Sequence, residues 1–291
     1  MRVTLGSLTL NFLRNLNAGL ERLAELQQRL ATGKRMQRPS DDPTNLPPVL
    51  VMRDALRAAE QYGRNAQDTA TLLGAGQQAL LDATGVLQRV RELALQASNG
   101  TLSASDLQTV RAEVSNLLDE LVALGNTQVA GRYLFAGTAT TTAPFVRTGD
   151  AVAYVGNSGA LLREVDRGVV LAASVPGDAA LGATFAAVTD VLTALASGDP
   201  AAVRAELPDL DSALDVLLQA QADLGARANR VDVLQQRWSE FAVQMRELLS
   251  VREDADMAEV VMELRLRENT YQAALAAGAR LLQPSLVDFL R

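Results

Sequence analysis

The chain has 291 residues and a formal net charge of −7, and 48% of the residues are hydrophobic although only 4% are aromatic. This length allows one large domain or two to three small ones, and the acidic balance argues against a protein that binds nucleic acid by neutralising phosphates. Cysteine and histidine are absent and Lys34 is the only lysine. These absences argue against Cys/His nucleophilic catalysis, Schiff-base chemistry and the usual zinc sites.

We therefore expect no enzyme, no cofactor and no metal, although a carboxylate-only or Ser-based site stays open. We also expect no membrane-crossing helix, because we find no apolar span of 18 residues in the sequence. The first residues lack a continuous apolar run, since Asn11, Arg14 and Asn15 interrupt it. We accordingly expect no cleaved signal peptide.

Five stretches of the chain carry apolar residues at alternating steps of three and four, which is typical of helices that pack along one face. We call each such set of positions a seam. The first seam ends at Gly33 and consists of Leu5, Leu8, Phe12, Leu16, Leu20, Leu23, Leu26 and Leu30. The second is predicted to begin near Val49, after Pro47 and Pro48, and to run to Ala97. Before it, Asp42 is placed to cap a helix that has Pro43 at its first position.

The third seam is predicted to start at a capping box formed by Ser103 and Asp106 and to end near Ala130. The pattern then changes, and from about Thr138 to Asp178 threonine and glycine clusters separate short runs of β-forming residues. These runs predict a small β-rich insertion with strands at 145–146, 152–155, 161–165 and 169–175.

A short helix is predicted over 185–196, and Asp199-Pro200 and Pro208 restart the helical pattern. The fourth seam runs from Leu217 to Leu248 and contains one charged residue, Arg227. Two interpretations of Arg227 are equally good: a snorkelling side chain, or an ion pair that sets the register between helices. The fifth seam consists of Met257, Val261, Leu264, Glu268, Tyr271, Leu275, Gly278, Leu282, Ser285 and Phe289.

This order predicts a mainly α protein: a long antiparallel helical rod, resembling a coiled-coil bundle, with paired terminal helices and a small central β-rich insertion domain. The expected parts are residues 1–44, an N-terminal helix that pairs with 252–291; the rod halves 45–138 and 184–251; the β-rich tip 139–183; and the C-terminal assembly helix 252–291. We expect the rod core to contain Leu224, Val231, Leu234, Trp238 and Phe241.

The two terminal helices are too few to cover each other's apolar faces, which predicts burial against other chains. The expected assembly interface comprises Leu5, Leu8, Phe12, Leu16, Leu264, Tyr271, Leu275, Leu282 and Phe289. The alternative is that these side chains are buried within the chain's own core and have no role in assembly.

Short motifs at several places along the chain carry a family resemblance. Residues 31–35 (ATGKR) with 38–43 (RPSDDP) resemble the N-terminal signature of the flagellin family, and 253–259 (EDADMAE) resembles the junction before its last helix. Residues 131–137 (GRYLFAG), 271–275 (YQAAL) and 283–290 (QPSLVDFL) are similar to segments of the family's hook-associated protein 3, or hook–filament junction, branch.

The resemblance implies a non-enzymatic flagellar subunit that is exported through the flagellar type III apparatus. Its implied partners are other copies of itself in a ring, a neighbouring hook-associated protein, flagellin and an export chaperone, with no nucleic acid and no membrane. The implied location is extracellular, at the junction of hook and filament. The alternatives are a short flagellin that forms the filament itself and, more remotely, a cytosolic helical scaffold or signalling module.

Overall fold

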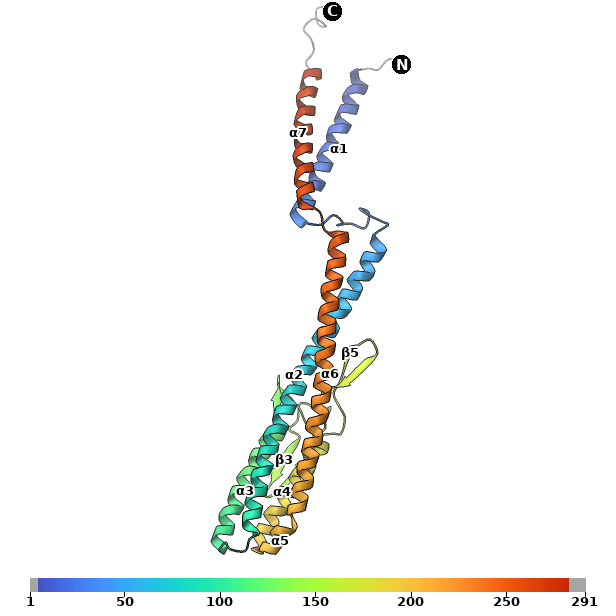
Figure 1. Cartoon of the computed structure of the whole chain (residues 1–291). Coiled ribbons are helices and arrows are strands. Elements are labelled where there is room, and N and C mark those ends of the chain that lie inside the picture. Colours follow the sequence, from blue (N-terminus) through green and yellow to red (C-terminus); the bar gives the residue numbers. More distant parts are fainter. Residues whose placement is uncertain (1–4, 283–291) are drawn as a thin grey trace, which may run out of the picture. The chain divides into compact units, whose positions relative to one another are not determined.

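The computed structural model describes the backbone of residues 5–282 and the side chains of residues 10–279. It divides into two compact units. Unit 1 comprises the described parts of 1–57 and 243–291, and unit 2 comprises 58–242. The bounds of the helices are α1 (Leu5–Thr32), α2 (Leu46–Ala97), α3 (Ala104–Gly125), α4 (Gly177–Ser197), α5 (Pro200–Ala205), α6 (Leu207–Glu253) and α7 (Met257–Leu282) (Figure 1).

The strands form three separate antiparallel hairpins in unit 2, pairing β1 with β2, β3 with β4 and β5 with β6. Their bounds are β1 (Gln128–Val129), β2 (Arg132–Tyr133), β3 (Phe145–Thr148), β4 (Ala151–Tyr154), β5 (Leu162–Asp166) and β6 (Val169–Ala172). The predicted fold class, mainly helical with a small central β-rich insertion, is confirmed. The sequence pattern did not predict β1 and β2, which are too short to show an alternation.

Helix α2 begins three residues earlier than the expected start at Val49. Its two prolines lie in the first turn, where their missing N–H groups would have had no helical partner. Upstream, the carboxylate of Asp42 accepts a hydrogen bond from the backbone N–H of Asn45 at 3.1 Å, and the carbonyl of Asp42 accepts the N–H of Leu46. Asp42 therefore caps the turn that leads into α2, and not a helix that begins at Pro43 as predicted, because Pro43 lies in this turn and α2 begins only at Leu46.

Helix α3 starts at the predicted capping box, in which Ser103 and Asp106 each accept from the other's backbone N–H. It ends at Gly125, five residues before the expected end near Ala130. A methyl group at Gly125 would lie 2.6 Å from Cδ2 of Phe145, so the glycine lets β3 approach the helix end. The side chain of Asn126 then bonds both the N–H and the carbonyl of Phe145, which turns the chain away from the helical path.

Helices position the hairpins of the insertion. The guanidinium of Arg147 in β3 bonds the carbonyl of Ser115 in α3 at 2.9 Å and pairs with Asp119 at 2.6 Å. In β5, the carbonyl of Val165 accepts a hydrogen bond from Nε1 of Trp238 at 2.9 Å. Side-chain hydrogen bonds in both directions, from hairpin to helix and from helix to hairpin, therefore hold the β region on the helices.

Helix α4 begins at Gly177, eight residues before the predicted helix start at Phe185. Its length and composition would allow a membrane span, contrary to our expectation that no such segment exists. In the structure, however, 56% of its apolar window is buried inside the protein. The helix packs on α3 and β4 and contributes Phe185, Val188, Val191 and Leu192 to the core, as the core helix of a globular unit does.

The core of unit 2 is one continuous apolar cluster drawn from its helices and hairpins. Of the five expected rod-core residues, Leu224 and Val231 are buried, whereas Leu234, Trp238 and Phe241 are half-buried. The ring of Trp238 stacks at a tilt on Tyr62, with ring centroids 5.1 Å apart, and meets Phe241 edge-on. These aromatic rings therefore lie at the edge of the core.

Arg227 fits the ion-pair interpretation in part, because its guanidinium pairs with Asp223 one turn earlier at 2.5 Å. That pair lies within α6 and so cannot set a register between helices. The same guanidinium reaches the carbonyls of Ala172 and Ser174 at 3.5 and 3.4 Å. Arg227 therefore ties α6 to the chain that leaves β6.

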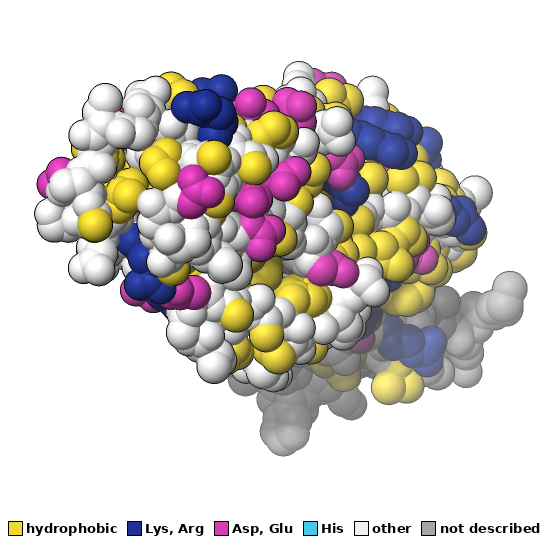
Figure 2. Space-filling model, turned by 90° about the horizontal axis from the view of Figure 1, so that it is seen from below, with side chains coloured by type: hydrophobic (Ala, Val, Ile, Leu, Met, Phe, Trp, Pro, Cys, Tyr) yellow, Lys and Arg dark blue, Asp and Glu magenta, His cyan; other side chains and the backbone are white. Residues whose placement is uncertain are grey.

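The surface of the face drawn in Figure 2 carries acidic, basic and apolar side chains interspersed with one another.

We expect Val231→Asp to lower the free energy of unfolding by several kcal/mol, because it places an unpaired carboxylate in a fully buried site. Val233→Asp is the matched control, since this valine lies two residues away in α6 and is 68% exposed. Thermal unfolding followed by circular dichroism measures both. Equal melting temperatures for the two variants would mean that the buried face of α6 is assigned wrongly.

Candidate assembly interface

The two terminal helices, α1 and α7, pack against each other in antiparallel register within unit 1 (Figure 1). Near the start of α1, the ring of Phe12 lies over Gly278, where a methyl group would come within 2.1 Å of it. Seven residues further along α1, Gly19 lies opposite Tyr271, and a methyl group there would lie 3.5 Å from Cδ2 of the tyrosine, an ordinary contact distance. Glycines on both helices therefore accommodate aromatic rings of the partner helix.

The face of α7 that packs on α1 differs in part from the predicted fifth seam. The positions shielded along this helix are Val260, Glu263, Leu264, Arg267, Tyr271, Ala274 and Gly278. Leu264, Tyr271 and Gly278 belong to the predicted seam, but Met257, Val261, Glu268 and Leu275 are exposed. The predicted seam thus runs along the edge of the packed face, and four of its seven described members are exposed.

On α1, the shielded positions are Phe12, Leu16, Gly19, Leu23, Leu26 and Leu30. Leu23 and Leu26 are fully buried, whereas Phe12 and Leu16 are half-buried. Leu20, which the sequence pattern included in the seam, is exposed. The packing of α1 therefore becomes tighter toward the end that leads into residue 33.

Large apolar side chains remain open to solvent on both helices. On α1 they are Leu10, Leu13 and Leu20, and on α7 they are Met257, Val261, Met262, Leu266 and Leu275. Met262 and Leu266 are 67% and 65% exposed. An apolar surface of this kind on a helix pair indicates a site for packing against another protein.

Four of the predicted interface residues have no described side-chain surroundings. Leu5, Leu8 and Leu282 lie in helices whose side chains are outside the described range at those positions, and Phe289 lies outside the described residues altogether. Phe12, Leu16, Leu264 and Tyr271 are half-buried between α1 and α7, and Leu275 is exposed.

A backbone bridge joins the chain that follows α1 to the chain that precedes α7. Lys34 and Asp254 form an isolated antiparallel β-bridge. Next to it, the N–H of Ala255 donates to the carbonyl of Gly33 at 2.9 Å, and the N–H of Arg35 donates to the carbonyl of Glu253 at 2.6 Å. The two motifs that resemble the flagellin family, 31–35 and 253–259, therefore meet in space, and the bridge sets where α1 ends relative to where α7 begins.

Charged side chains surround this bridge. The carboxylate of Glu253 is 5% exposed and pairs with Nε of Arg53 at 2.7 Å and with Nζ of Lys34 at 3.7 Å. The ammonium of Lys34 also pairs with Asp254 at 2.5 Å. The hydrogen bond from Lys34, together with a second one from Ser250, holds the pKa of Asp254 below its ordinary value. A buried carboxylate needs such cations, because an unpaired one is costly.

The neighbouring acids act as caps. The carboxylate of Asp41 accepts the N–H groups of Gln37 and Arg38, which lowers its pKa. Asp256 accepts the N–H groups of Ala258 and Glu259 and so starts α7. Hydrogen bonds from backbone N–H groups thus account for Asp41 and Asp256. The described residues contain no group of three or more possible metal ligands.

The sequence pattern did not predict the pairing of Lys34 with Glu253 and Asp254. A signal was present, because the only lysine lies in one family-like motif and both acids lie in the other. Sequence alone did not show that the motifs touch, since 220 residues separate Lys34 from Asp254.

Comparison with known proteins agrees with these motifs. Residues 5–140 match the model of the bacterial flagellin N-terminal helical region. This match, together with the relatives that follow, supports a protein of the flagellin family. It is 28% identical over 278 residues to flagellar hook-associated protein 3 of Escherichia coli K12, covering 84% of this chain and 87% of that protein. It is also 29% identical to a flagellin of Bacillus subtilis, over the full length of both chains.

Solved structures agree with the fold. A flagellar hook-associated protein from Vibrio parahaemolyticus superposes with a TM-score of 0.67 at 24% identity, over 73% of this chain and 99% of that one. Hook-associated protein 3 from Legionella pneumophila superposes with a TM-score of 0.63 at 18% identity, over 69% of this chain and 98% of that one. The resemblance that the motifs predicted is confirmed.

We expect Gly278→Ala to loosen the α1–α7 pair, because the new methyl group would collide with the ring of Phe12. Gly19→Ala is the matched control, since its methyl group would make an ordinary contact with Tyr271 and alanine favours helix. Hydrogen exchange of the α1 amides measures the effect. Faster exchange in Gly278→Ala alone supports the observed register, and equal exchange in both variants contradicts it.

We expect acid to weaken the bridge. The folded-state pKa of Asp254 is lowered from 3.8, so its stabilising contribution is present above that pH and is lost as the pH falls through the lowered value. Asp254→Asn should therefore lose less stability than the wild type as the pH falls below about 4, measured as the melting temperature of the full-length chain. Asp232→Asn, an exposed change in unit 2, should follow the wild type. Parallel curves for wild type and Asp254→Asn would contradict the ion pair.

Proposed function

We propose that this chain is a structural subunit of the bacterial flagellum that joins the hook-associated zone to the flagellin filament. The observation that carries the proposal is the open apolar surface on the α1–α7 pair, which has Leu10 and Leu13 on one helix and Met262 and Leu266 on the other. A single chain leaves these side chains in water, whereas neighbouring subunits packed in parallel would cover them. The terminal segments 1–44 and 252–291 are thus the proposed assembly domain.

The junction role is supported by the similarity to hook-associated protein 3 of Escherichia coli over most of both chains. In this proposal the partners are copies of the chain itself in a ring, a neighbouring hook-associated protein, flagellin and, before assembly, an export chaperone. In this proposal the protein works outside the cell and catalyses no reaction.

A second candidate is a short flagellin that forms the filament itself. It is favoured by the full-length match to the flagellin of Bacillus subtilis, at an identity equal within a percentage point to that of the hook-associated protein. Both candidates use the same terminal helices. They differ in where the protein lies along the flagellum and in how many copies are present.

Immunogold labelling of isolated flagella with antibodies against unit 2 separates the two candidates. The junction role requires a single band of label where the hook meets the filament. Label along the whole filament would establish the flagellin role, and a flagellum without label would contradict both. A strain that lacks this gene is the control for antibody specificity.

We expect Leu275→Asp to leave the monomer folded but to prevent assembly. Leu275 is 44% exposed in the single chain, so a carboxylate there stays hydrated until another subunit covers it. Leu275→Met is the matched control, because it keeps an apolar side chain of similar volume. Monomer melting curves and the amount of flagellin lost to the medium measure the two effects. A destabilised monomer would place Leu275 in the chain's own core, and normal filaments would exclude this face from assembly.

A further inference from the structure

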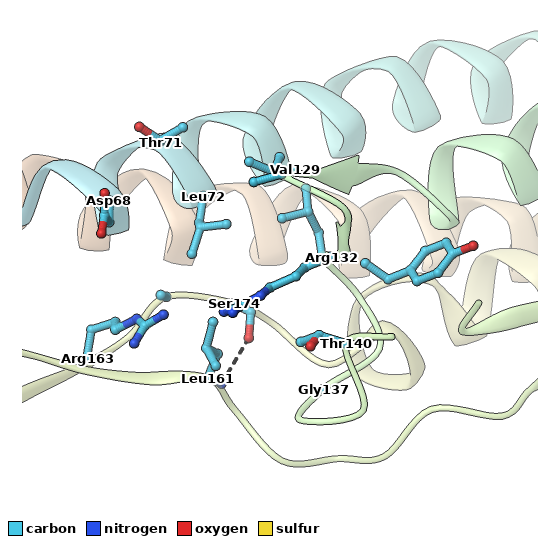
Figure 3. A pocket seen from close by; sticks show the side chains of 14 residues that line it. Asp68, Thr71, Leu72, Val129, Arg132, Gly137, Thr140, Leu161, Arg163 and Ser174 are labelled. Atoms are coloured by element: carbon cyan, nitrogen blue, oxygen red, sulfur yellow. Dashed lines mark hydrogen bonds between the residues drawn. The ribbon is translucent and has the colours of Figure 1, made fainter. Parts of the chain in front are cut away.

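A hollow of about 320 Å³ lies in unit 2 between α2, the β1–β2 hairpin and the chain on either side of β5–β6 (Figure 3). Apolar side chains form much of its wall, from Leu72, Val129, Leu134 and Leu161. Its size is that of a pocket for a small organic molecule.

Two arginines converge on the hollow from opposite sides. Figure 3 shows the guanidinium groups of Arg132 and Arg163 both ending in the space between Leu72 on α2 and Leu161. Among the described residues, neither guanidinium has an ion-pair or hydrogen-bond partner, and Nε of Arg163 is fully buried with no acceptor. A buried donor without a partner is costly, and two cations that face one hollow repel each other.

The remaining polar groups do not neutralise this charge. Asp68 borders the hollow from α2, but it forms no ion pair with either arginine in the described structure. The hydroxyl of Ser174 accepts the N–H of Leu161 at 3.0 Å (Figure 3), which leaves its own hydrogen free to donate. The hollow therefore has two cations against one carboxylate, together with a hydroxyl donor and an apolar wall.

We propose that this hollow binds a carboxylate carried on an apolar body. A planar carboxylate accepts two hydrogen bonds from a guanidinium fork, so it matches Arg163 and Arg132 better than a spherical anion does. The apolar part of the ligand lies against Leu72 and Leu161. The carboxylate comes either from a free organic acid or from an acidic side chain of an adjacent chain. The site lies outside the assembly helices, so it is independent of the function proposed above.

The first experiment titrates the purified full-length chain with sodium hexanoate and follows saturation-transfer difference NMR at constant ionic strength. Hexanamide has the same shape without the charge, and we expect it to bind about tenfold more weakly or worse. Arg163→Gln should reduce hexanoate binding by a similar factor. Arg167→Gln, the matched control, removes the same charge from the turn of the same hairpin, outside the hollow, and should bind as the wild type does.

Three results would overturn the proposal: no binding of hexanoate, equal binding of hexanoate and hexanamide, or unchanged binding in Arg163→Gln. Arg132→Gln provides a second test if Arg163→Gln does not give a wild-type melting curve. A further arm titrates N-acetylglutamate methylamide, in which a peptide bears the carboxylate. Tighter binding of this compound than of hexanoate identifies an acidic side chain of an adjacent chain as the occupant, and weaker binding identifies a free organic acid.

Discussion

The contact on which unit 1 depends is the meeting of residues 33–36 with the end of α6 at Glu253. The backbone carbonyl of Glu253 accepts the N–H of Arg35, while its shielded carboxylate lies between Arg53 of α2 and Lys34. The α1–α7 register follows from this position, because α1 ends and α7 begins within a few residues of the bridge. A slip of either helix along the other would separate the carboxylate from its cations, which gives the register an electrostatic cost as well as a packing cost.

The scarcity of aromatic residues decides how the helices pack. Small residues lie where helices approach closely: a methyl group at Gly76 of α2 would touch Leu224 of α6, and Gly278 of α7 lies under the ring of Phe12. Close backbone approach compensates for thin side chains, since dispersion contacts depend on short distances between many atoms. The few aromatic rings are concentrated instead where helices meet the hairpins, as with Phe145 between β4 and α4.

Much of the fold could be predicted from the sequence, because its helices are long and each carries a strong period and a recognisable start. The capping box at Ser103 was predicted from local chemistry, and the structure has it. Asp42 was predicted to cap a helix but caps the turn before α2, because the helix begins only at Leu46. The end of α3 could not be predicted, because the signal is a contact with Phe145 that only the folded chain makes. The face of α7 was predicted only in part, because apolar residues occupy more than one side of that helix and the period alone does not say which side meets α1. The two arginines of the hollow carry no local pattern at all.

The three hairpins of the insertion share no hydrogen-bonded edge with one another in the described structure. Side-chain hydrogen bonds tie two of them to the helices, from Arg147 of β3 to α3 and from Trp238 of α6 to β5. At the turns, Gly149 and Gly168 take the left-handed backbone conformation, with φ of 64° and 73°. A residue added at one turn therefore disturbs no neighbouring strand. Mutations that alter the length or surface of one hairpin leave the other two in place, so this region can diversify its exterior over evolutionary time while the helices that carry assembly stay unchanged.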